Sequence, residues 1–384
     1  MCIDNDHETR TMLLEAVNAT LRKLGGINLA HSLQQRDTQT ASRLWSTFAK
    51  QGWLGVLVPE ELGGSGLGVY EMAAIAEGLG GIAAALPYSG CAVMTSITLA
   101  GCGHLEAGTH LTALMEGSTS YALAWQEQAF REQRPIAGTL PTTTLVDGRV
   151  SGVKQLIVTD GAPDHYIVLA QENGNPTLCL VAAGATGTLV QTQTAVDGTH
   201  YQTLMLREAP VVQVLLAGMP AAFLCDHAIE TGTLAASAEL YGVMSAALKL
   251  TLEYLRTRVQ FGRPIGAFQA LQHRAADLFI QKDLSYSVLN EALNVVDKDV
   301  RDTERQTRVA RAKARCSDAA LRIVKDAVQL HGAIGYTDEY DLSCFVKRAM
   351  VLASWLGNGT AHRRAYFNAV YSRTSIAGIE AVPA

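Results

Sequence analysis

One carboxylate, Glu239, stands on a predicted helical face that is otherwise made of small residues. The residues that share this face at helical spacing are Gly232, Ala235, Ala236, Gly242, Val243 and Ala246. A buried carboxylate costs free energy unless it has a partner or a task, and burial raises its pKa towards the range of a general base. Two interpretations follow: Glu239 is a catalytic base, or it is a structural carboxylate paired with an arginine or a backbone group at a subunit contact.

A second group of polar and aromatic residues lies at a predicted turn. The stretch RVQFGRPIGAFQALQHRAADL (258–278) places Arg258, Gln260 and Phe261 directly before a Gly-Arg-Pro-Ile-Gly segment. The sequence on both sides has helical periodicity. What such a turn would serve depends on the elements around it.

The spacing of apolar residues changes twice along the chain, which predicts three domains. Helical spacing from about Thr9 to about Met115 predicts an N-terminal α-helical domain, residues 1–117. Short β-branched runs separated by Asp-Gly and Asn-Gly pairs predict hairpins and a middle antiparallel β domain, residues 118–217. Long helical patterns after Pro220 predict a C-terminal four-helix bundle, residues 218–384. The expected fold class is therefore α+β and multidomain.

Composition excludes several classes of function. The 384 residues are 48% hydrophobic, enough to bury substantial cores, and the net charge of −5 provides no basic field for nucleic acid. Apolar runs are too short for a membrane span and the first residues lack a signal-peptide pattern, so we expect a cytoplasmic protein. The seven cysteines have no CxxC spacing, which predicts reduced thiols.

No metal site is expected. Asp338, Glu339 and Asp341 form an acidic cluster with Tyr336, but no histidine is spaced with them. We interpret this cluster as a solvated loop.

Three segments together resemble the acyl-CoA dehydrogenase family, and the resemblance covers nearly the whole chain. The segment QGWLGVLVPEELGGSGLGVYEMAAIAEGLG is similar to a helix-turn-helix of the family's N-terminal domain. RVQFGRPIGAFQALQHRAADL and QLHGAIGYTDEY are similar to its two flavin-contact signatures. The resemblance implies an FAD-dependent enzyme that dehydrogenates acyl-CoA thioesters, assembled as a dimer of dimers.

The first flavin signature supplies the groups that FAD needs, namely a fixed cation, bonding groups and a closely approaching backbone. By the resemblance, Arg258 reaches the pyrophosphate, while Gln260 and Phe261 hold and cover parts of the nucleotide. In the family these residues contact the flavin of a neighbouring subunit.

Other flavin contacts are implied nearer the C-terminus. Gln329, Gly332 and Gly335 match positions on the adenosine side, with Ala333 where the family usually has another glycine. Thr360 and His362 match positions that touch the flavin.

The middle domain departs from the family. Thr-Glu-Pro-Gly and Trp-Ile-Thr segments are common there, whereas this chain has YALAWQEQAFREQ and VKQLIVTDGAPD. Gln126, Glu127 and Thr159 could do part of the flavin-binding work.

The residues at the positions of the family's catalytic base also differ from the family pattern. Dehydrogenation removes a proton beside the thioester carbonyl while a hydride passes from the next carbon to the flavin. The family's usual glutamate before Gly-Thr is replaced by Asn358, and the other base position known in the family falls on Thr231 beside Gly232. Glu230 is adjacent but points about 100° away around the helix. Glu239 is the remaining candidate.

Two functions follow from these departures. The chain is an active dehydrogenase that uses Glu239 on a bulky acyl-CoA, or it is a catalytically silent partner in a heteromeric enzyme. As a silent partner it completes the other subunit's FAD site with Arg258, Phe261 and Gln329. Members with a segment like WLGNGTAHRR look like those that act on CoA esters of steroid side chains or ring acids, in lipid or steroid catabolism. The expected assembly is a homo- or heterotetramer.

Overall fold

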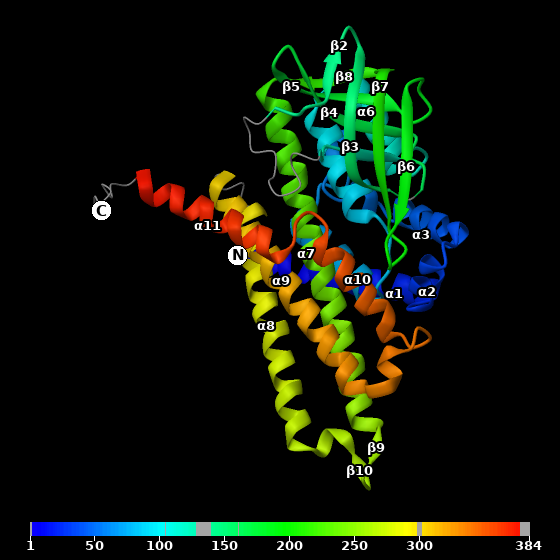
Figure 1. Cartoon of the computed structure of the whole chain (residues 1–384), viewed down its shortest axis with the longest axis vertical. Coiled ribbons are helices and arrows are strands. Elements are labelled where there is room, and N and C mark those ends of the chain that lie inside the picture. Colours follow the sequence, from blue (N-terminus) through cyan, green and yellow to red (C-terminus); the bar gives the residue numbers. More distant parts are fainter. Residues whose placement is uncertain (1, 104, 128–139, 160, 298–301, 377–384) are drawn as a thin grey trace.

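The computed structural model describes residues 2–103, 105–127, 140–159, 161–297 and 302–376. They form helices, then a sheet, then helices again, in chain order (Figure 1). The expected architecture of two helical regions around a middle β region is confirmed.

The N-terminal region is helical up to Met115. Its helices are α1 (Cys2–Leu24), α2 (Asn28–Gln34), α3 (Thr38–Lys50), α4 (Val69–Gly81), the π-helix η3 (Ser89–Met94), α5 (Thr95–Gly101) and α6 (Leu105–Met115). Asp37 begins α3 because its carboxylate accepts hydrogen bonds from the backbone N–H groups of Gln39 and Thr40. The side chain of Glu71 stabilises the start of α4, because its carboxylate accepts a hydrogen bond from the backbone N–H of the N-cap residue Gly68.

The middle region is one eight-stranded sheet. Its strands are β1 (Tyr121–Ala124), β2 (Thr144–Val146), β3 (Arg149–Thr159), β4 (His165–Glu172), β5 (Asn175–Ala182), β6 (Thr188–Thr194), β7 (His200–Pro210) and β8 (Gln213–Ala217). The order is β6-β7-β3-β2-β4-β5-β8, with β1 paired to β4.

The hairpins lie where the sequence predicts them, but the sheet is mixed. Asp147 and Gly148 join β2 to β3 with positive φ angles of 47° and 71°, as expected for a two-residue hairpin turn. Asn173 and Gly174 do the same between β4 and β5. However, β1 and β2 run parallel to β4. The predicted antiparallel hairpins are present, whereas these two parallel pairings were not predicted because turn residues specify only the strands that they join.

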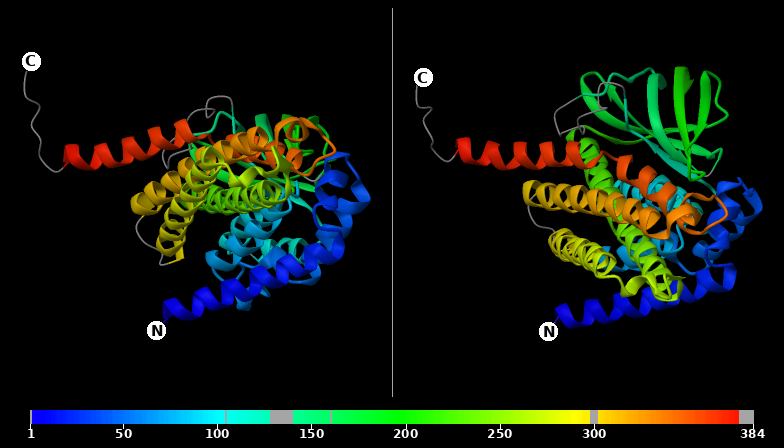
Figure 2. Two further views of the ribbon diagram at one scale, coloured as in Figure 1. Left: turned by 90° about the horizontal axis from the view of Figure 1, so that it is seen from below. Right: turned by 60° about the horizontal axis from the view of Figure 1, so that its bottom comes forward.

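The C-terminal region is built on α7 (Met219–Thr257), which runs from the sheet to the far tip of the molecule (Figure 1). A small hairpin of β9 (Val259–Gln260) and β10 (Arg263–Pro264) connects it to α8 (Gln269–Asp297). The bundle continues with α9 (Asp302–His331) and α10 (Leu342–Ser354), and α11 (Gly359–Ile376) projects away from it (Figure 2).

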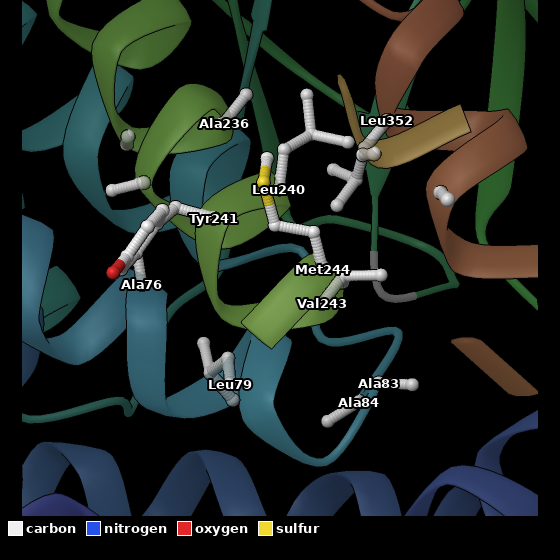
Figure 3. Close-up of a cluster of buried hydrophobic side chains, with 14 of the residues drawn as sticks. Ala76, Leu79, Ala83, Ala84, Ala236, Leu240, Tyr241, Val243, Met244 and Leu352 are labelled. Atoms are coloured by element: carbon white, nitrogen blue, oxygen red, sulfur yellow. The ribbon is translucent and has the colours of Figure 1, made fainter. Parts of the chain in front are cut away.

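The small-residue face of α7 packs closely on α4. A Cβ atom added at Gly242 would lie 2.1 Å from the carbonyl oxygen of Glu77, and one at Gly80 would lie 2.0 Å from that of Glu239. Ala76 and Leu79 of α4 belong to the same buried apolar cluster as Ala236 and Val243 of α7 (Figure 3). Close helix packing therefore explains much of the small-residue stripe.

Candidate functional site

The turn between α7 and α8 presents an aromatic ring to solvent. Phe261 is 91% exposed, and it adopts a positive φ of 54° beside Gly262 at 76°. Such backbone angles are uncommon for residues with a Cβ and store strain. The hairpin thus holds Phe261 outward at the tip of the molecule.

Arg258 ends α7 one residue before this hairpin and is exposed. Its guanidinium has no hydrogen-bond or ion-pair partner among the residues that the structure describes. The amide of Gln260 donates to the carbonyl of Val259 at 2.8 Å. A free, exposed cation at a rigid turn is suited to an anionic group of another molecule.

The second signature lies beside the first. The ring of His331, at the end of α9, stacks on that of Tyr254 in the last turn of α7, with centroids 4.4 Å apart. Gln329 is exposed, and a Cβ atom at Gly332 would meet nothing within 4 Å. Gly335 is closely packed, since a Cβ atom there would lie 2.8 Å from the carbonyl oxygen of Val328. Gln329 and Gly332 therefore face outward, whereas Gly335 serves packing within the chain.

Asn358, Thr360 and His362 lie at the start of α11. The polar groups of their side chains form hydrogen bonds within the chain. Asn358 caps this helix, because its side-chain oxygen accepts a hydrogen bond from the backbone N–H of Ala361 at 2.9 Å. Thr360 is exposed, and His362 is buried with Nε2 2.9 Å from the carbonyl oxygen of Leu356. The buried Lys313 donates to the carbonyl oxygens of Leu352 and Gly357 and fixes the preceding loop.

Neither expected base position carries an acid, and the nearby glutamate is paired. Thr231 donates to the carbonyl of His227 at 3.0 Å. Glu230 is buried, with Oε2 2.6 Å from Nε of Arg305. A Cβ at Gly232 would lie 3.7 Å from the side chain of Leu356, so the segments that carry the two base positions face each other.

Apolar side chains fill the space between the sheet and these segments. One apolar cluster joins side chains from three regions. They are Met94 of η3, Trp125 directly after β1, and Trp355 and Leu356 of the α10–α11 loop. Met94 and Leu356 of this apolar cluster therefore lie next to Gly232, beside one of the two expected base positions.

Glu127 and Thr159, the candidates from the middle domain, are engaged within the sheet. The carboxylate of Glu127 accepts hydrogen bonds from Lys154 and from the backbone and side chains of Thr142 and Thr143. Burial alone would raise the pKa of Glu127, but Lys154 and the two threonines lower it to about 2. Thr159 is buried and donates to the carbonyl of Gly161 at 2.9 Å.

Glu239 is buried in an ion pair that reaches from the bundle to the sheet. Its Oε1 accepts from Nε and Nη2 of Arg348 at 2.7 and 2.6 Å. The same guanidinium donates through Nη1 to Asp197 at 2.7 Å and to Thr199 at 2.9 Å. The arginine partner that one interpretation expected is present, but it lies in the same chain and not at a subunit contact.

The surroundings leave Glu239 little space for a substrate. Burial raises the pKa of Glu239 to about 7, against the lowering effect of Arg348. The carboxylate borders a cavity of about 10 Å³ that Gly90, Val158 and Trp355 also line, space for roughly one water molecule.

Among the described residues, the exposed turn offers groups suited to FAD, whereas the cavities near the sheet are small. Ligand pockets span roughly 300 Å³ or more, while the cavity beside Glu239 holds about 10 Å³, one beside Thr159 about 170 Å³ and one beside Tyr121 about 250 Å³. Arg258, Gln260 and Phe261 are exposed on a rigid turn, where they can meet a nucleotide held by another subunit.

The part of the chain that the structure describes has neither a cluster of metal ligands nor a membrane-spanning helix. No group of three or more His, Cys, Asp or Glu residues there could hold a metal ion. Likewise, none of the helices in those ranges is both long and apolar enough to cross a membrane.

No spacing or motif in the sequence identifies Arg348 or Asp197 as a partner of Glu239. The available signal for Arg348 is a basic residue inside the apolar run FVKRAMVLA. Asp197 belongs to an Asp-Gly pair, which the sequence explains as a hairpin turn. Only the fold reveals that both meet Glu239.

Comparison with known proteins places this geometry in a family. The models "Acyl-CoA dehydrogenase, N-terminal domain" and "Acyl-CoA dehydrogenase, C-terminal domain" match residues 7–123 and 225–370. The acyl-CoA dehydrogenase IpdE2 of Mycolicibacterium smegmatis is 27% identical over 357 residues, covering 91% of this chain and 95% of IpdE2. FadE27 of Mycobacterium tuberculosis, also named an acyl-CoA dehydrogenase, is 29% identical over 331 residues, covering 84% of this chain and 86% of FadE27.

Two solved structures at 25% identity have the same overall fold. The Tcur3481-Tcur3483 steroid ACAD superposes with a TM-score of 0.85, and the match covers 96% of this chain and 99% of the matched ACAD chain. A chain of the ChsE4-ChsE5 complex from Mycobacterium tuberculosis superposes with a TM-score of 0.81, and the match covers 97% of this chain and 98% of the matched chain. The fold and the matches to both domains show that this chain belongs to the acyl-CoA dehydrogenase family, a family of FAD-dependent oxidoreductases.

Proposed function

We propose that this chain is one subunit of a heteromeric, FAD-dependent acyl-CoA dehydrogenase that acts on a bulky thioester, such as the CoA ester of a steroid side chain or ring acid. Two similar structures, one described as a steroid ACAD from a Tcur3481-Tcur3483 pair and one as a ChsE4-ChsE5 complex, support this class of substrate and assembly. The proposed assembly is a heterotetramer.

The observation that carries the proposal is the contrast between a filled crevice and an exposed flavin-binding turn. Met94, Trp125 and Trp355 fill the crevice, and Asn358 and Thr231 stand where the family carries its base. A chain with this crevice needs a partner subunit to hold the flavin ring and to supply the base.

The role of this chain is then to complete the partner's cofactor site. Arg258 would pair with the pyrophosphate, and Gln260 and Phe261 would hold and cover the nucleotide. Gln329 and the open backbone at Gly332 lie at the same end of the bundle, next to the Tyr254–His331 stack.

A second candidate function has an observation in its favour. A pKa of about 7 is suited to a general base, so Glu239 is the group that would remove the substrate proton if this chain were itself catalytic. The ion pair with Arg348 and the water-sized cavity favour the first proposal.

The test is a count of flavin per chain. The chain is purified alone and together with an acyl-CoA dehydrogenase subunit from the same genome, a neighbouring gene being the first choice, and FAD is released and measured against each polypeptide. We expect FAD only in the mixed assembly. Stoichiometric FAD in the chain purified alone, with reduction by an acyl-CoA, would overturn the proposal in favour of Glu239 catalysis.

A further inference from the structure

A buried cluster of three charged side chains joins the sheet to the helical bundle. Glu239 lies on α7, Arg348 on α10, and Asp197 on the turn between β6 and β7. Their exposed fractions are 1%, 4% and 0%. The two carboxylates bind the same guanidinium from opposite structural regions.

Hydrogen bonds within the β6–β7 turn and its contact with α2 fix the shape of the turn, in addition to its contact with Arg348. Asp197 accepts hydrogen bonds from the backbone N–H and the hydroxyl of Thr199 at 2.9 and 3.0 Å. Gly198 has a φ of 94°, and a Cβ there would lie 2.7 Å from the carbonyl oxygen of Leu33 on α2. The turn is therefore held between α2 on one side and Arg348 on the other.

The cluster has unequal charge. One guanidinium faces two carboxylates, so the ionised cluster has one uncompensated negative charge in a buried place, where such a charge is costly. The titratable groups around Glu239 are Arg348 from α10, Asp197 from the turn and Tyr201 from β7, while α4 presents the backbone at Gly80. A proton on Glu239 makes the cluster neutral and leaves its hydrogen bonds in place.

We propose that the Glu239–Arg348–Asp197 cluster is a proton-sensitive latch that clamps the β6–β7 turn onto the bundle and closes most firmly when Glu239 is protonated. The latch needs neither flavin nor substrate, so it stands independently of the proposed function. Separating the turn from α10 removes Asp197 from Arg348 and opens the buried carboxylate to water.

The direction of the pH effect follows from the pKa of Glu239. Burial raises it from an ordinary 4.5 to about 7 in the closed latch, and access to water returns it towards the ordinary value. Between these two values the closed state binds more protons than the open state, so rising pH favours opening. The extra stability is complete below about pH 4.5 and is lost as the pH rises through about 7.

Hydrogen exchange in the turn tests the latch. Backbone exchange at residues 195–200 is measured in the full chain, in its native assembly, at about pH 5.5 and about pH 8, and corrected for intrinsic rates. We expect local opening to be at least about tenfold more frequent at the higher pH, because each unit of pKa separation is worth a factor of ten.

Two variants change the pH effect by different routes. Glu239→Gln removes the titrating group and with it the pH dependence. Asp197→Asn removes the second carboxylate, which lessens the rise in the pKa of Glu239 that burial mainly causes, so the pH dependence should weaken. Glu230→Gln is the matched control, since this glutamate is buried on the same helix but pairs with Arg305. It should keep the pH dependence of the unmodified chain.

The outcomes separate clearly. Loss of the pH dependence in Glu239→Gln together with a weaker dependence in Asp197→Asn, with retention in the control, supports the latch. Unchanged dependence in Glu239→Gln or Asp197→Asn, or exchange in the unmodified chain that does not change with pH, overturns it. Because no readout involves FAD, a failed latch leaves the flavin count of the proposed function unaffected.

Discussion

Asn358 and Thr231 occupy the two positions that the family resemblance assigns to the catalytic base, and both side chains bind backbone groups of their own helices. Asn358 accepts from Ala361 at the start of α11, and Thr231 donates to His227 within α7. Neither an amide nor a hydroxyl takes a proton at neutral pH. At the residue scale, this chain has helix-stabilising groups where a catalytic relative has an acid.

Replacement of Asn358 should affect stability and not catalysis. Asn358→Ala removes the cap of α11 and should lower the free energy of unfolding by about 1 kcal/mol, which a thermal melt of the assembly would detect. The rate of flavin reduction per bound FAD should stay within a few-fold. Asn358→Asp, which retains a capping oxygen, is the control and should melt like the unmodified chain. A 100-fold slower reduction with FAD still bound would show a direct role for Asn358.

Glu239→Gln separates a base from a structural acid. The change keeps the shape and removes the proton acceptor, so loss of a general base would slow flavin reduction by about 100-fold or more. Because Arg348 holds this carboxylate in a water-sized space, we expect the reduction rate per flavin to be nearly unchanged in the mixed assembly. Stopped-flow bleaching of the flavin, with chain stoichiometry measured on the same sample, gives the answer. A large loss of rate in a fully assembled variant would make Glu239 the base.

The need of Glu239 for a partner could be predicted from the sequence, but the partner could not. A carboxylate on a small-residue face predicts either a partner or a task. Arg348 is 109 residues away and Asp197 meets Arg348 across 151 residues, so only the folded chain brings them together. Exposure of Arg258 and Phe261 was likewise implied by the family resemblance, whereas the packing at Gly335 depends on a local turn that no spacing rule describes.

At the scale of elements, periodicity and turn residues account for most of the architecture. The long helices follow from their apolar spacing, and the hairpins follow from Asp-Gly and Asn-Gly pairs. The parallel pairing of β1 and β2 with β4 depends on contacts between distant segments, which local patterns do not encode. The filled crevice depends in the same way on side chains from three separate regions.

The contact between α4 and α7 gives a test at this scale. Gly80→Ala would place a methyl group 2.0 Å from a backbone carbonyl of α7, so the helices must move apart. We expect a loss of about 1 to 3 kcal/mol in the free energy of unfolding. Gly81→Ala is the matched control, because a Cβ at the next residue meets nothing within 4 Å. Equal melting temperatures for the two variants would contradict this description of the contact.

At the scale of the whole molecule, the polar groups suited to FAD and the crevice that would hold its ring are at different places. The exposed turn with Phe261 lies at the far tip of α7, well away from the sheet (Figure 1). An apolar cluster occupies the region where the sheet, η3 and the α10–α11 loop meet. This separation is the basis for the proposed contact of the turn with the flavin of another subunit.

That division predicts which arginine the assembly needs to retain its flavin. Arg258→Ala removes an unpaired, exposed cation from the turn and with it charge-assisted contacts worth about 1.5 to 3 kcal/mol each, so FAD should dissociate roughly 10- to 100-fold more readily from the mixed assembly. Arg256→Ala is the control, because it removes an equally exposed charge from the last turn of the same helix without touching the hairpin. FAD content after gel filtration, measured against both polypeptides, should fall in the first variant and stay constant in the second. Equal retention in an intact assembly would mean that Arg258 does not reach the pyrophosphate, and the chain would then need another way to contribute to its partner's site.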